Sequence, residues 1–294
     1  METLENLQRK INSANDLESV VKTMKTMAAS KIHQFEMASL ALKDYFKTIQ
    51  LGLLAFLKNA PKDIEIQAFN PKNNQRRVIA LVFGSDQGLV GQFNNVLASF
   101  VKENFKEQQQ KVDIWVVGER MVDRLQDVDM QTSKHFSIPS SVNAITEVVA
   151  QILFHLEQEK TAQGFSEFYI FHNKPNTSVG YTCWSQRLLP LDNQWKKDIE
   201  KQQWPTNKIP QAIGQLEIIL MSLIKEYLFV SLYKSCSESL ASENASRLEA
   251  MQRAEKNIEE IMDELKSNYH RLRQGKIDEE LFDVVAGFES INKK

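Results

Sequence analysis

Apolar side chains recur at helical spacing at both ends of the chain. From Leu4 to Phe56 they follow one another mostly in steps of three and four residues, which is the period of one face of an α-helix. The same spacing runs from Leu216 to Leu272. No glycine or proline interrupts residues 1–51 or 215–274. The pattern predicts two helices far longer than the globular average, and two such one-sided helices predict an antiparallel coiled coil.

The middle of the chain has a different pattern. Short runs rich in β-branched and aromatic residues alternate with helical segments, and such alternation predicts a mainly parallel sheet covered by helices. The predicted strands are residues 77–83, 112–117, 165–171 and, as a fourth candidate, 181–189, and the predicted helices are residues 94–109, 119–126 and 142–162. The predicted fold class is therefore α/β: a long antiparallel two-helix coiled coil formed by the N- and C-terminal helices, with an inserted Rossmann-like α/β domain.

Proline-containing stretches set the predicted domain limits. We expect an N-terminal coiled-coil helix over residues 1–58 and a linker over 59–76. The α/β domain is expected over residues 77–208, and the C-terminal coiled-coil helix over 209–291.

The charge balance and the cysteine count limit the partners and the compartment. The formal net charge is −2, from 36 basic and 38 acidic residues, so no overall field favours nucleic acid or an anionic membrane. Two cysteines are too few for a disulfide framework, which is typical of a reducing compartment. The N-terminus lacks a signal-peptide pattern, and no apolar run approaches the roughly 18 to 20 residues that cross a bilayer. We therefore expect a cytoplasmic protein with no nucleic-acid partner that meets a membrane only through other proteins.

Glycines 84, 88 and 91 follow the first predicted strand, and such a turn is a candidate phosphate cradle. However, no lysine follows Gly91 as a P-loop requires, and the GxGxxG spacing is absent. The favoured interpretation is a tight strand-to-helix turn closed by Gly88 and Gly91, in which Asp86 and Asn94 suit turn and N-cap roles.

Other residue types give no catalytic or metal site. Each of the five histidines lacks a second ligand at helical spacing, and no GxSxG or HExxH pattern occurs. We therefore expect no catalytic residues, no metal and no cofactor. On the terminal helices, Lys22 and Lys25 lie one turn apart on one face, for which the plainer interpretation is a solvated surface. Residues 237–251 have small side chains that would let another segment pass close to the helix, an interpretation with no advantage over an ordinary helix face.

Four stretches of the sequence, in this order, resemble the signature segments of one family. They are MKTMAASK (residues 24–31), GSDQGLVGQFN (84–94), LASENASRLEAMQRAEKN (240–257) and NYHRLRQGKIDEELFDVVAGFESI (268–291). In combination and spacing they are similar to the γ subunit of F-type ATP synthases, from near Leu4 to Ile291. The resemblance covers essentially the whole chain and agrees with the predicted order of helix, α/β domain and helix.

The resemblance implies a non-catalytic rotor. In that family the coiled coil is an asymmetric shaft inside a ring of α and β subunits, and the α/β domain is a foot on the membrane c-ring beside the ε subunit. It thus implies α, β, ε and the c-ring as partners, no cofactor, and a peripheral place on the cytoplasmic face of the bacterial inner membrane. Shaft rotation would couple ion flow through the c-ring to ATP synthesis or hydrolysis at the β subunits.

The resemblance also assigns residues that contact β. Arg273 and Gln274 match an arginine–glutamine pair that hydrogen-bonds an acidic catch loop on β, a contact suited to a forked guanidinium. Asp278 and Glu280 stand where a threonine and a glutamate support the same contact, so Asp278 departs from the family pattern.

Further positions on the shaft match less uniformly. Met24 and Arg247 match a helix-face pair, one on each terminal helix, at the exposed middle of the shaft where coupling with β is tuned. Lys22 and Lys31 also match. Lys25 stands where an acidic residue is common, which predicts a more positive shaft surface toward β.

The turn of the foot, formed by Asp86, Gln87, Gly88 and Gly91, departs most from the family. Relatives usually have SDRGLCGGLN where this chain has SDQGLVGQFN, so Gln87 and Gln92 replace an arginine and a glycine. The plastid-type insertion with its regulatory cysteine pair is also missing. These departures favour a divergent bacterial branch, such as the alternative, sodium-associated type.

Two other hypotheses come from different functional classes. An α/β enzyme or nucleotide-binding domain with helical oligomerisation arms would require a ligand at residues 84–94. A structural coiled-coil protein without a motor role would leave the match at Arg273 and Gln274 unexplained.

Overall fold

The computed structural model describes residues 3–59, 77–106, 111–162, 164–176, 180–191 and 193–292, with the backbone alone for 193–194 and 287–292. By their contacts the residues divide into two compact units, Ala29–Ser246 and a smaller unit made of Met1–Ala28 with Arg247–Lys294. The long helices α1 (Leu4–Asn59) and α6 (Leu216–Asn292) each contribute to both units. The predicted linker, residues 59–76, lies outside the described residues except for Asn59, and the predicted domain limits stay a prediction.

In the smaller unit, α1 and α6 run antiparallel. Lys25 Nζ of α1 lies 2.5 Å from Glu255 Oε2 of α6. Lys22, one turn earlier on α1, interacts electrostatically with Glu259, one turn later on α6. Residue numbers therefore rise on one helix as they fall on the other. Buried apolar residues line both helices: Leu7, Ile11, Ala14 and Ala28 on α1, and Met251 and Met262 on α6.

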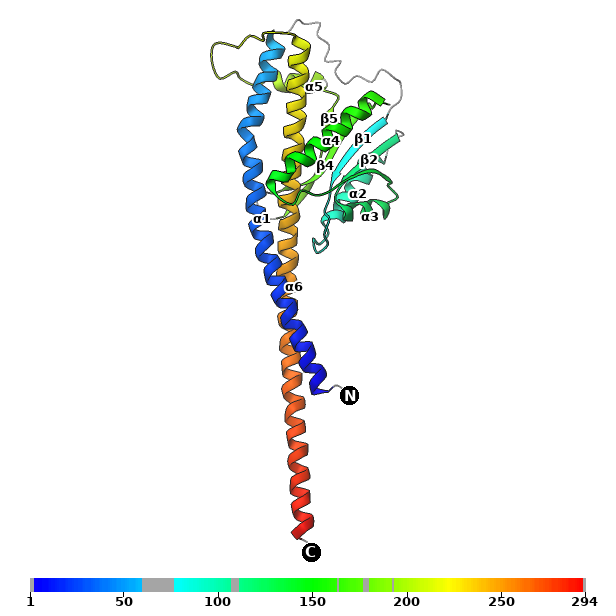
Figure 1. Cartoon of the computed structure of the whole chain (residues 1–294), viewed down its shortest axis with the longest axis vertical. Coiled ribbons are helices and arrows are strands. Elements are labelled where there is room, and N and C mark those ends of the chain that lie inside the picture. The colour runs from blue at the N-terminus through cyan, green and yellow to red at the C-terminus, as the bar shows by residue number, and fades with distance from the viewer. Residues whose placement is uncertain are drawn as a thin grey trace. The chain divides into compact units, whose positions relative to one another are not determined.

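In the larger unit the two helices also run antiparallel and lie side by side (Figure 1). The Tyr45 hydroxyl donates a hydrogen bond to Glu226 at 2.8 Å. Gly52 comes later on α1 and faces Leu223, which comes earlier on α6. A Cβ at Gly52 would lie 3.1 Å from Leu223 Cδ2. The missing side chain thus lets the helices approach closely near the end of α1.

The inserted domain is built on a five-stranded sheet with the strand order β3-β2-β1-β4-β5. The strands are β1 (Arg77–Phe83), β2 (Lys111–Val117), β3 (Thr132–Phe136), β4 (Glu167–Pro175) and β5 (Tyr181–Leu189). The first four pair in parallel, and β5 pairs antiparallel with β4. Central β1 is buried along nearly its whole length, which explains its continuous apolar sequence.

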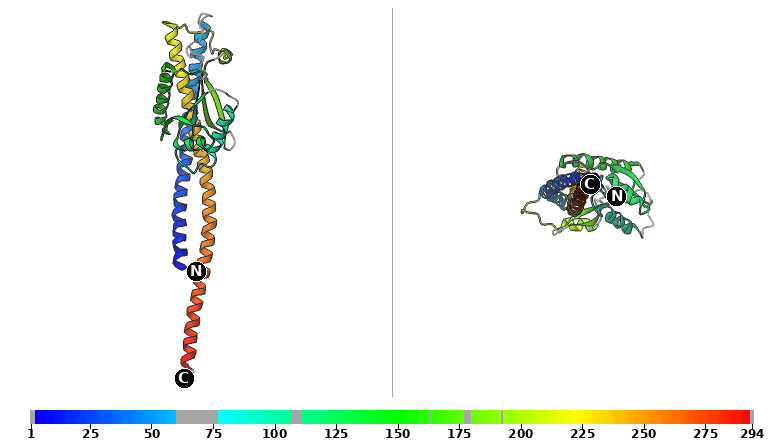
Figure 2. Two further views of the ribbon diagram at one scale, coloured as in Figure 1. Left: turned by 90° about the vertical axis from the view of Figure 1, so that its right-hand side faces the viewer. Right: turned by 90° about the horizontal axis from the view of Figure 1, so that it is seen from below.

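Helices cover both faces of the sheet (Figure 2). They are α2 (Phe93–Phe105) and α3 (Glu119–Gln126) on one face and α4 (Val142–Ala162) on the other, while α5 (Asn193–Glu200) packs its Trp195 on Tyr227 of α6. Because side chains alternate along a strand, Val78 and Val82 of β1 pack with α2 and α3, whereas Ile79 and Phe83 pack with α4 and the facing parts of α1 and α6. The second face is therefore the one through which the sheet is attached to the long helices of this unit.

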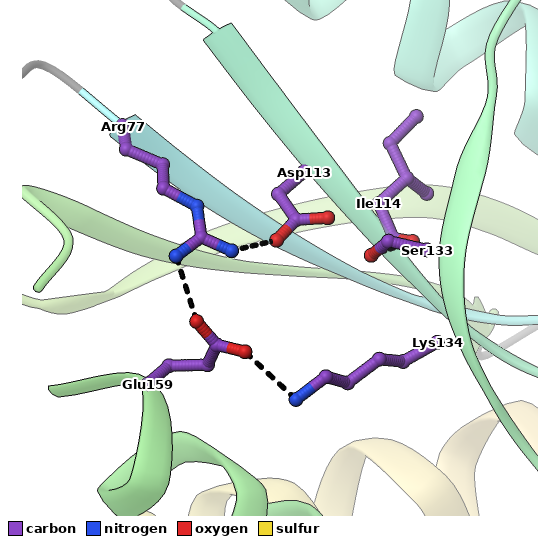
Figure 3. A network of polar contacts seen from close by, with 6 residues as sticks. All are labelled: Arg77, Asp113, Ile114, Ser133, Lys134 and Glu159. Atoms are coloured by element: carbon purple, nitrogen blue, oxygen red, sulfur yellow. Dashed lines mark hydrogen bonds and ion pairs between the residues drawn. The ribbon is translucent and has the colours of Figure 1, made fainter. Parts of the chain in front are cut away.

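A charged network ties the start of β1 to its neighbours (Figure 3). The Arg77 guanidinium donates to Asp113 of β2 and, at 2.7 Å, to Glu159 of α4. Lys134 of β3 donates to the other oxygen of Glu159 at 2.8 Å. Burial opposes ionisation of Glu159, but the hydrogen bonds from Lys134 and Arg77 hold its pKa below the ordinary value. One carboxylate thus connects two strands to α4.

The predicted fold class is confirmed, with two differences in detail. The predicted limits of β1, β5, α3 and α4 are those observed, and β2, β4 and α2 are shifted by a few residues at one or both ends. The sequence did not predict β3 or α5. The β3 sequence is mostly polar and only its last residue is buried, while α5 has only eight residues.

Candidate functional site

The turn between β1 and α2 is the stretch that the sequence marked as a candidate phosphate cradle. Its backbone has positive φ at Leu89 (62°) and at Gly91 (56°). Gly88 does not have positive φ, so the conformational need for glycine lies at Gly91. Gln87, Gly88 and Leu89 form an exposed tip, whereas Ser85 and Val90 on either side are buried.

Ser85 and Asn94 close this turn through reciprocal hydrogen bonds. The Ser85 backbone N–H donates to Asn94 Oδ1 at 3.1 Å, and Asn94 Nδ2 donates to Ser85 Oγ at 2.7 Å. The expected N-cap role of Asn94 is wrong: Gln92 occupies that position of α2, without a side-chain cap, and Asn94 is the second residue of the helix. Its amide is instead directed back at the turn, because the buried Ser85 needs both a donor and an acceptor.

Asp86 caps a helix, but not the one that follows it in sequence. Its Oδ1 accepts from the Glu119 backbone N–H at 2.9 Å, at the start of α3, and its Oδ2 accepts from the Ile138 N–H at 3.3 Å. A carboxylate is thus placed at a helix N-terminus, where a phosphate would otherwise be favoured. Asp86 thus ties the turn to the start of α3 and to the segment after β3.

Two glycines allow the strands and the turn to approach closely. Gly118 has a φ of 103°, and a Cβ there would lie 2.9 Å from the Ser85 backbone. A Cβ at Gly84 would lie 2.2 Å from Met121 Cβ, the start of the side chain that fills this space. Both positions need glycine for packing, which explains the glycines around this turn without any ligand.

Three serines of α6 hold the sheet at the carboxyl ends of its strands. Ser239 Oγ donates to the Phe83 carbonyl at 3.2 Å, at the end of β1. Ser242 Oγ donates to the Asn173 carbonyl of β4 at 3.0 Å, and Ser246 Oγ donates to the Val90 carbonyl in the turn at 2.6 Å. We call Ser239, Ser242 and Ser246 the serine face. Within residues 237–251, the small side chains from Ser239 to Ser246 thus lie against the chain's own sheet and the turn after β1.

Asn173 extends this attachment across the domain. Its side chain is fully buried, and its Nδ2 donates to the Phe93 carbonyl at 3.1 Å at the start of α2. Its Oδ1 accepts from Cys183 Sγ of β5 at 3.2 Å. Together with the serine face, Asn173 fixes two strands, the turn and α2 to one side of α6. The sequence signal for this arrangement is the spacing of three and four residues between the serines, which places them on one helix face.

A buried histidine–glutamate pair lies next to the serine face and was not predicted. His172 of β4 is 2% exposed, and its Nε2 lies 2.9 Å from Glu238 Oε2 on α6. Burial lowers the pKa of His172 below 6.5, although the bond to Glu238 opposes the shift. Burial opposes ionisation of Glu238, but the hydrogen bond from His172 holds its pKa below 4.5. We therefore assign a neutral imidazole that donates from Nε2 to a carboxylate.

Two other kinds of site are absent from the described ranges of the chain. No cluster of three or more histidine, cysteine, aspartate or glutamate side chains there could hold a metal ion. No helix there is both long and apolar enough to cross a membrane.

The family model described as ATP synthase matches residues 3–291. The chain belongs to the ATP synthase family. Among curated relatives, it is 25% identical to the ATP synthase gamma chain of Nautilia profundicola, with all of both chains covered. It is 26% identical to the ATP synthase gamma chain of Wolbachia sp. subsp. Drosophila simulans, covering 99% of this chain and 100% of the relative.

Solved structures share the fold of this ATP synthase family member. The rotor of Euglena gracilis mitochondrial ATP synthase includes a chain that is 16% identical and superposes with a TM-score of 0.64, covering 93% of this chain and 98% of that one. A chain from the OSCP/F1/c-ring part of the same assembly is also 16% identical and gives a TM-score of 0.66 over 98% and 94% of the two chains. At this identity the likeness establishes the fold alone.

The predicted β-contact residues of this ATP synthase family member lie on α6 and, for Met24, on α1. Arg273, Gln274, Asp278 and Glu280 are all exposed. Helical spacing places Gln274 and Asp278 one turn apart on the same face, and Glu280 two turns beyond Arg273.

Met24 and Arg247 are less exposed than expected for residues on the exposed middle of the shaft. Met24 is half-buried, and Arg247 is only 9% exposed. The expected excess of positive charge is also reduced, because Lys22 pairs with Glu18 and Lys25 with Glu255, each at 2.5 Å. The roles of these residues toward a partner stay predictions.

Proposed function

We propose that this chain is the central-stalk rotor, the γ subunit, of an F-type ATP synthase. The match of the family model to residues 3–291 carries the proposal, because it spans both long helices and the inserted domain. In this role the chain couples ion flow through a membrane ring to ATP synthesis or hydrolysis at the β subunits by rotating. Binding at the β sites and shaft angle are then reciprocally coupled.

The exposed apolar side chains at the end of α6 are evidence that a partner surrounds this part of the helix. Every described side chain from His270 to Ala286 is exposed, on all sides of the helix. Large apolar side chains are among them: Leu272, Ile277, Leu281, Phe282, Val284 and Val285. A helix gains most of its stability by burying an apolar face, and contiguous exposed apolar groups mark interaction surfaces. We assign this segment to the interior of the α and β ring.

The proposed partners are the α and β subunits, the ε subunit and the c-ring. The names of the similar structures support the catalytic head and the c-ring, since they describe a rotor, an F1 part, a central stalk and a c-ring. We assign residues 77–208 to the foot, and residues 1–58 and 209–291 to the shaft. The membrane is then reached only through these partners, with the chain peripheral on the cytoplasmic face of the bacterial inner membrane.

As a rotor, the chain has no catalytic role of its own. The glycine turn after β1 lacks the P-loop lysine and the GxGxxG spacing, and its Ser85 and Asn94 hydrogen-bond each other. We further assign Arg273, Gln274, Asp278 and Glu280 to a contact with an acidic loop of β, and Met24 and Arg247 to the tuning of coupling. The exposure of the first four residues is compatible with that contact.

Reconstitution tests the proposal. The full-length chain is mixed with the α and β subunits of its own organism, and the products are separated by gel filtration and assayed for ATP hydrolysis. We expect one stoichiometric complex with ATPase activity. Elution of the chain apart from α and β, with no gain in activity, would refute the rotor assignment.

A further inference from the structure

The inserted domain is joined to α6 at a pair of buried ionisable side chains. His172 of β4 is 2% exposed, and its Nε2 lies 2.9 Å from Glu238 Oε2 of α6. The serine face follows directly on α6, where Ser239 and Ser242 bond to carbonyls at the ends of β1 and β4. We call the contact of His172 with Glu238 the imidazole joint. It is thus part of the attachment of the sheet to the helix.

One nitrogen of the imidazole has no hydrogen-bond partner. Nε2 donates to Glu238, so Nδ1 carries the free lone pair of a neutral ring. Nδ1 is buried and makes no hydrogen bond within the described part of the chain. A second proton on the ring would have to bind there, and the new N–H would be buried without an acceptor. The closed joint therefore favours the neutral form of His172.

The charged groups around the ring do not offset this cost. Burial lowers the pKa of His172, and the hydrogen bond to Glu238 opposes the shift only in part. Lys234 of α6 also approaches this carboxylate, at 3.9 Å from Glu238 Oε1. Lys174, from the same strand as His172, and Lys234 lower the pKa further by repelling a positive ring. On β5 the residue paired with His172 is the uncharged Trp184.

The imidazole joint lies beside a cavity that is open to solvent. The cavity has a volume of about 330 Å³ between β4, β5, α5 and facing stretches of α1 and α6, and His172 and Glu238 are among its lining residues. Trp184 in its wall is 47% exposed. From α5 the lining residue Asp198 is paired with Lys201 at 2.8 Å. A local separation of β4 from α6 is thus enough to admit water to the buried ring.

We propose that the imidazole joint is acid-sensitive: protonation of His172 at Nδ1 is coupled to a local separation of β4 from α6, while the rest of the sheet stays folded. In the open form the imidazolium is hydrated, and water accepts the hydrogen bond from Nδ1. Acid then loosens the inserted domain from the long helix. This property belongs to the fold itself; it goes beyond the rotor proposal and does not rest on it.

The size of the effect follows from proton linkage. A hydrated imidazole has a pKa of about 6.5, and the closed joint holds the ring neutral. The open form therefore binds more protons than the closed form as the pH falls through that value. From about pH 7.5 to 5.5 the ratio of open to closed joints should rise roughly tenfold.

Thiol labelling of Cys236 measures this opening in the full-length chain. Cys236 is 1% exposed, lies on α6 two residues before Glu238, and belongs to the apolar cluster that α6 shares with the sheet. In a Cys183→Ser chain it is the only thiol. Its labelling rate with 4,4′-dithiodipyridine is divided by the rate for the same chain unfolded in urea at the same pH. We expect this quotient, which reports the open fraction, to rise roughly tenfold from about pH 7.5 to 5.5.

A second reporter separates local opening from unfolding of the whole domain. Ala98→Cys, in a chain that also carries Cys183→Ser and Cys236→Ala, places a thiol on α2 in the apolar cluster of the other face of the sheet. It should label more slowly than Cys236 and depend more steeply on low urea concentrations, because that dependence scales with the surface exposed. Equal rates and equal urea dependence at the two sites would overturn the local opening.

Variants assign the acid effect to His172. His172→Gln keeps a donor for Glu238 but does not titrate, so labelling of Cys236 should give the same open fraction at both pH values. His270→Gln is the matched control, because it removes an exposed histidine of the same helix α6, and it should keep the tenfold rise. Lys174→Met removes a cation that faces the ring, so the closed joint takes up a proton more readily and the rise should be smaller.

Circular dichroism confirms that each of these variants is folded. The absence of a rise in the wild type, or a rise of the same size in His172→Gln, would overturn the proposal. If His172→Gln does not fold, an undiminished rise in Lys174→Met would overturn it.

Discussion

At the scale of single residues, the packing around Ser85 explains why residue 118, which is distant in sequence, is a glycine. Gly118 follows β2 and has a φ of 103°, and a Cβ added there would lie 2.9 Å from the Ser85 backbone. Ser85 is itself fixed by Asn94 on one side and by its contact with the Arg120 N–H on the other. Neither backbone segment can move away without breaking these bonds.

Gly118→Ala is expected to destabilise the chain by about 2–4 kcal/mol, because backbone strain of roughly 1–3 kcal/mol adds to a steric clash. Gly164→Ala is the matched control: its φ is 72°, but nothing lies within 4 Å of the added Cβ. It should show only the backbone cost, about 1–2 kcal/mol. Urea unfolding followed by circular dichroism measures both, and equal losses would show that the contact with Ser85 is unimportant.

His172 is expected to make stability depend on pH. Burial lowers the pKa of His172 in the folded chain below 6.5, the value of the unfolded chain, although Glu238 opposes this. The unfolded chain then binds more protons as the pH falls below 6.5, so stability should decrease in that direction. The groups that act on His172 are Glu238 and Lys234 from α6 and Lys174 from its own strand.

The measurement is urea unfolding of the wild type and of His172→Gln at a series of pH values from 5 to 7.5. The variant lacks the titrating group, so the difference in unfolding free energy between the two proteins should narrow as the pH falls. A difference that stays constant over this range would mean that His172 is not held neutral by the fold.

At the scale of elements, the attachment of the sheet to α6 depends on the serine face. Each of its hydroxyls satisfies a carbonyl at the carboxyl end of a strand or in the turn after β1. Removing a donor leaves a buried carbonyl unsatisfied, which costs more than the hydrogen bond itself contributes.

Ser242→Ala and Ser246→Ala are each expected to cost about 1–3 kcal/mol in unfolding free energy. Ser222→Ala on the same helix is the control, because its hydroxyl is exposed and donates only to the Ile218 carbonyl one turn earlier. That change should lie within about 0.5 kcal/mol of wild type. Thermal and urea unfolding provide the values, and losses no larger than that of the control would disprove the proposed attachment.

An element could be predicted from the sequence where its apolar pattern is complete within the element itself. Strand β1 and helices α3 and α4 were predicted with their observed limits, since an apolar run or an apolar period is complete within each of them. Strand β3 carries no such run: only its last residue is buried, and it belongs to the sheet through pairing with β2. The roles of Asn94 and of the serine face were missed because their partners are distant in sequence and become neighbours only after folding.

At the scale of the whole molecule, the two long helices are the feature that sequence alone predicted best. Their periodicity, the absence of glycine and proline and the four matching segments all indicated the same architecture. The contact residues at Arg273 and beyond could be placed only by resemblance, because nothing in their own pattern distinguishes them from an ordinary exposed helix.

Arg273→Ala is expected to lower ATP synthesis by the reconstituted enzyme roughly tenfold, because a charged hydrogen bond to the proposed β loop contributes about that factor. Assembly should be unaffected, since the side chain is exposed and no core contact is lost. Lys256→Ala is the control, because Lys256 is an exposed cation of the same helix about five turns earlier and has no assigned contact with β. Synthesis is measured in proteoliposomes, and a normal rate in Arg273→Ala would remove this residue from the contact.

The serine face occupies the edge of the sheet at which related topologies hold a ligand. In open parallel sheets, ligands bind at the carboxyl edge of the strands, where the loops leave a crevice. Here Ser239, Ser242 and Ser246 hold that edge against α6. A nucleotide could enter there only after the helix had separated from the sheet. The sheet thus has the topology of a binding domain, while the edge where such a domain holds its ligand is here attached to α6.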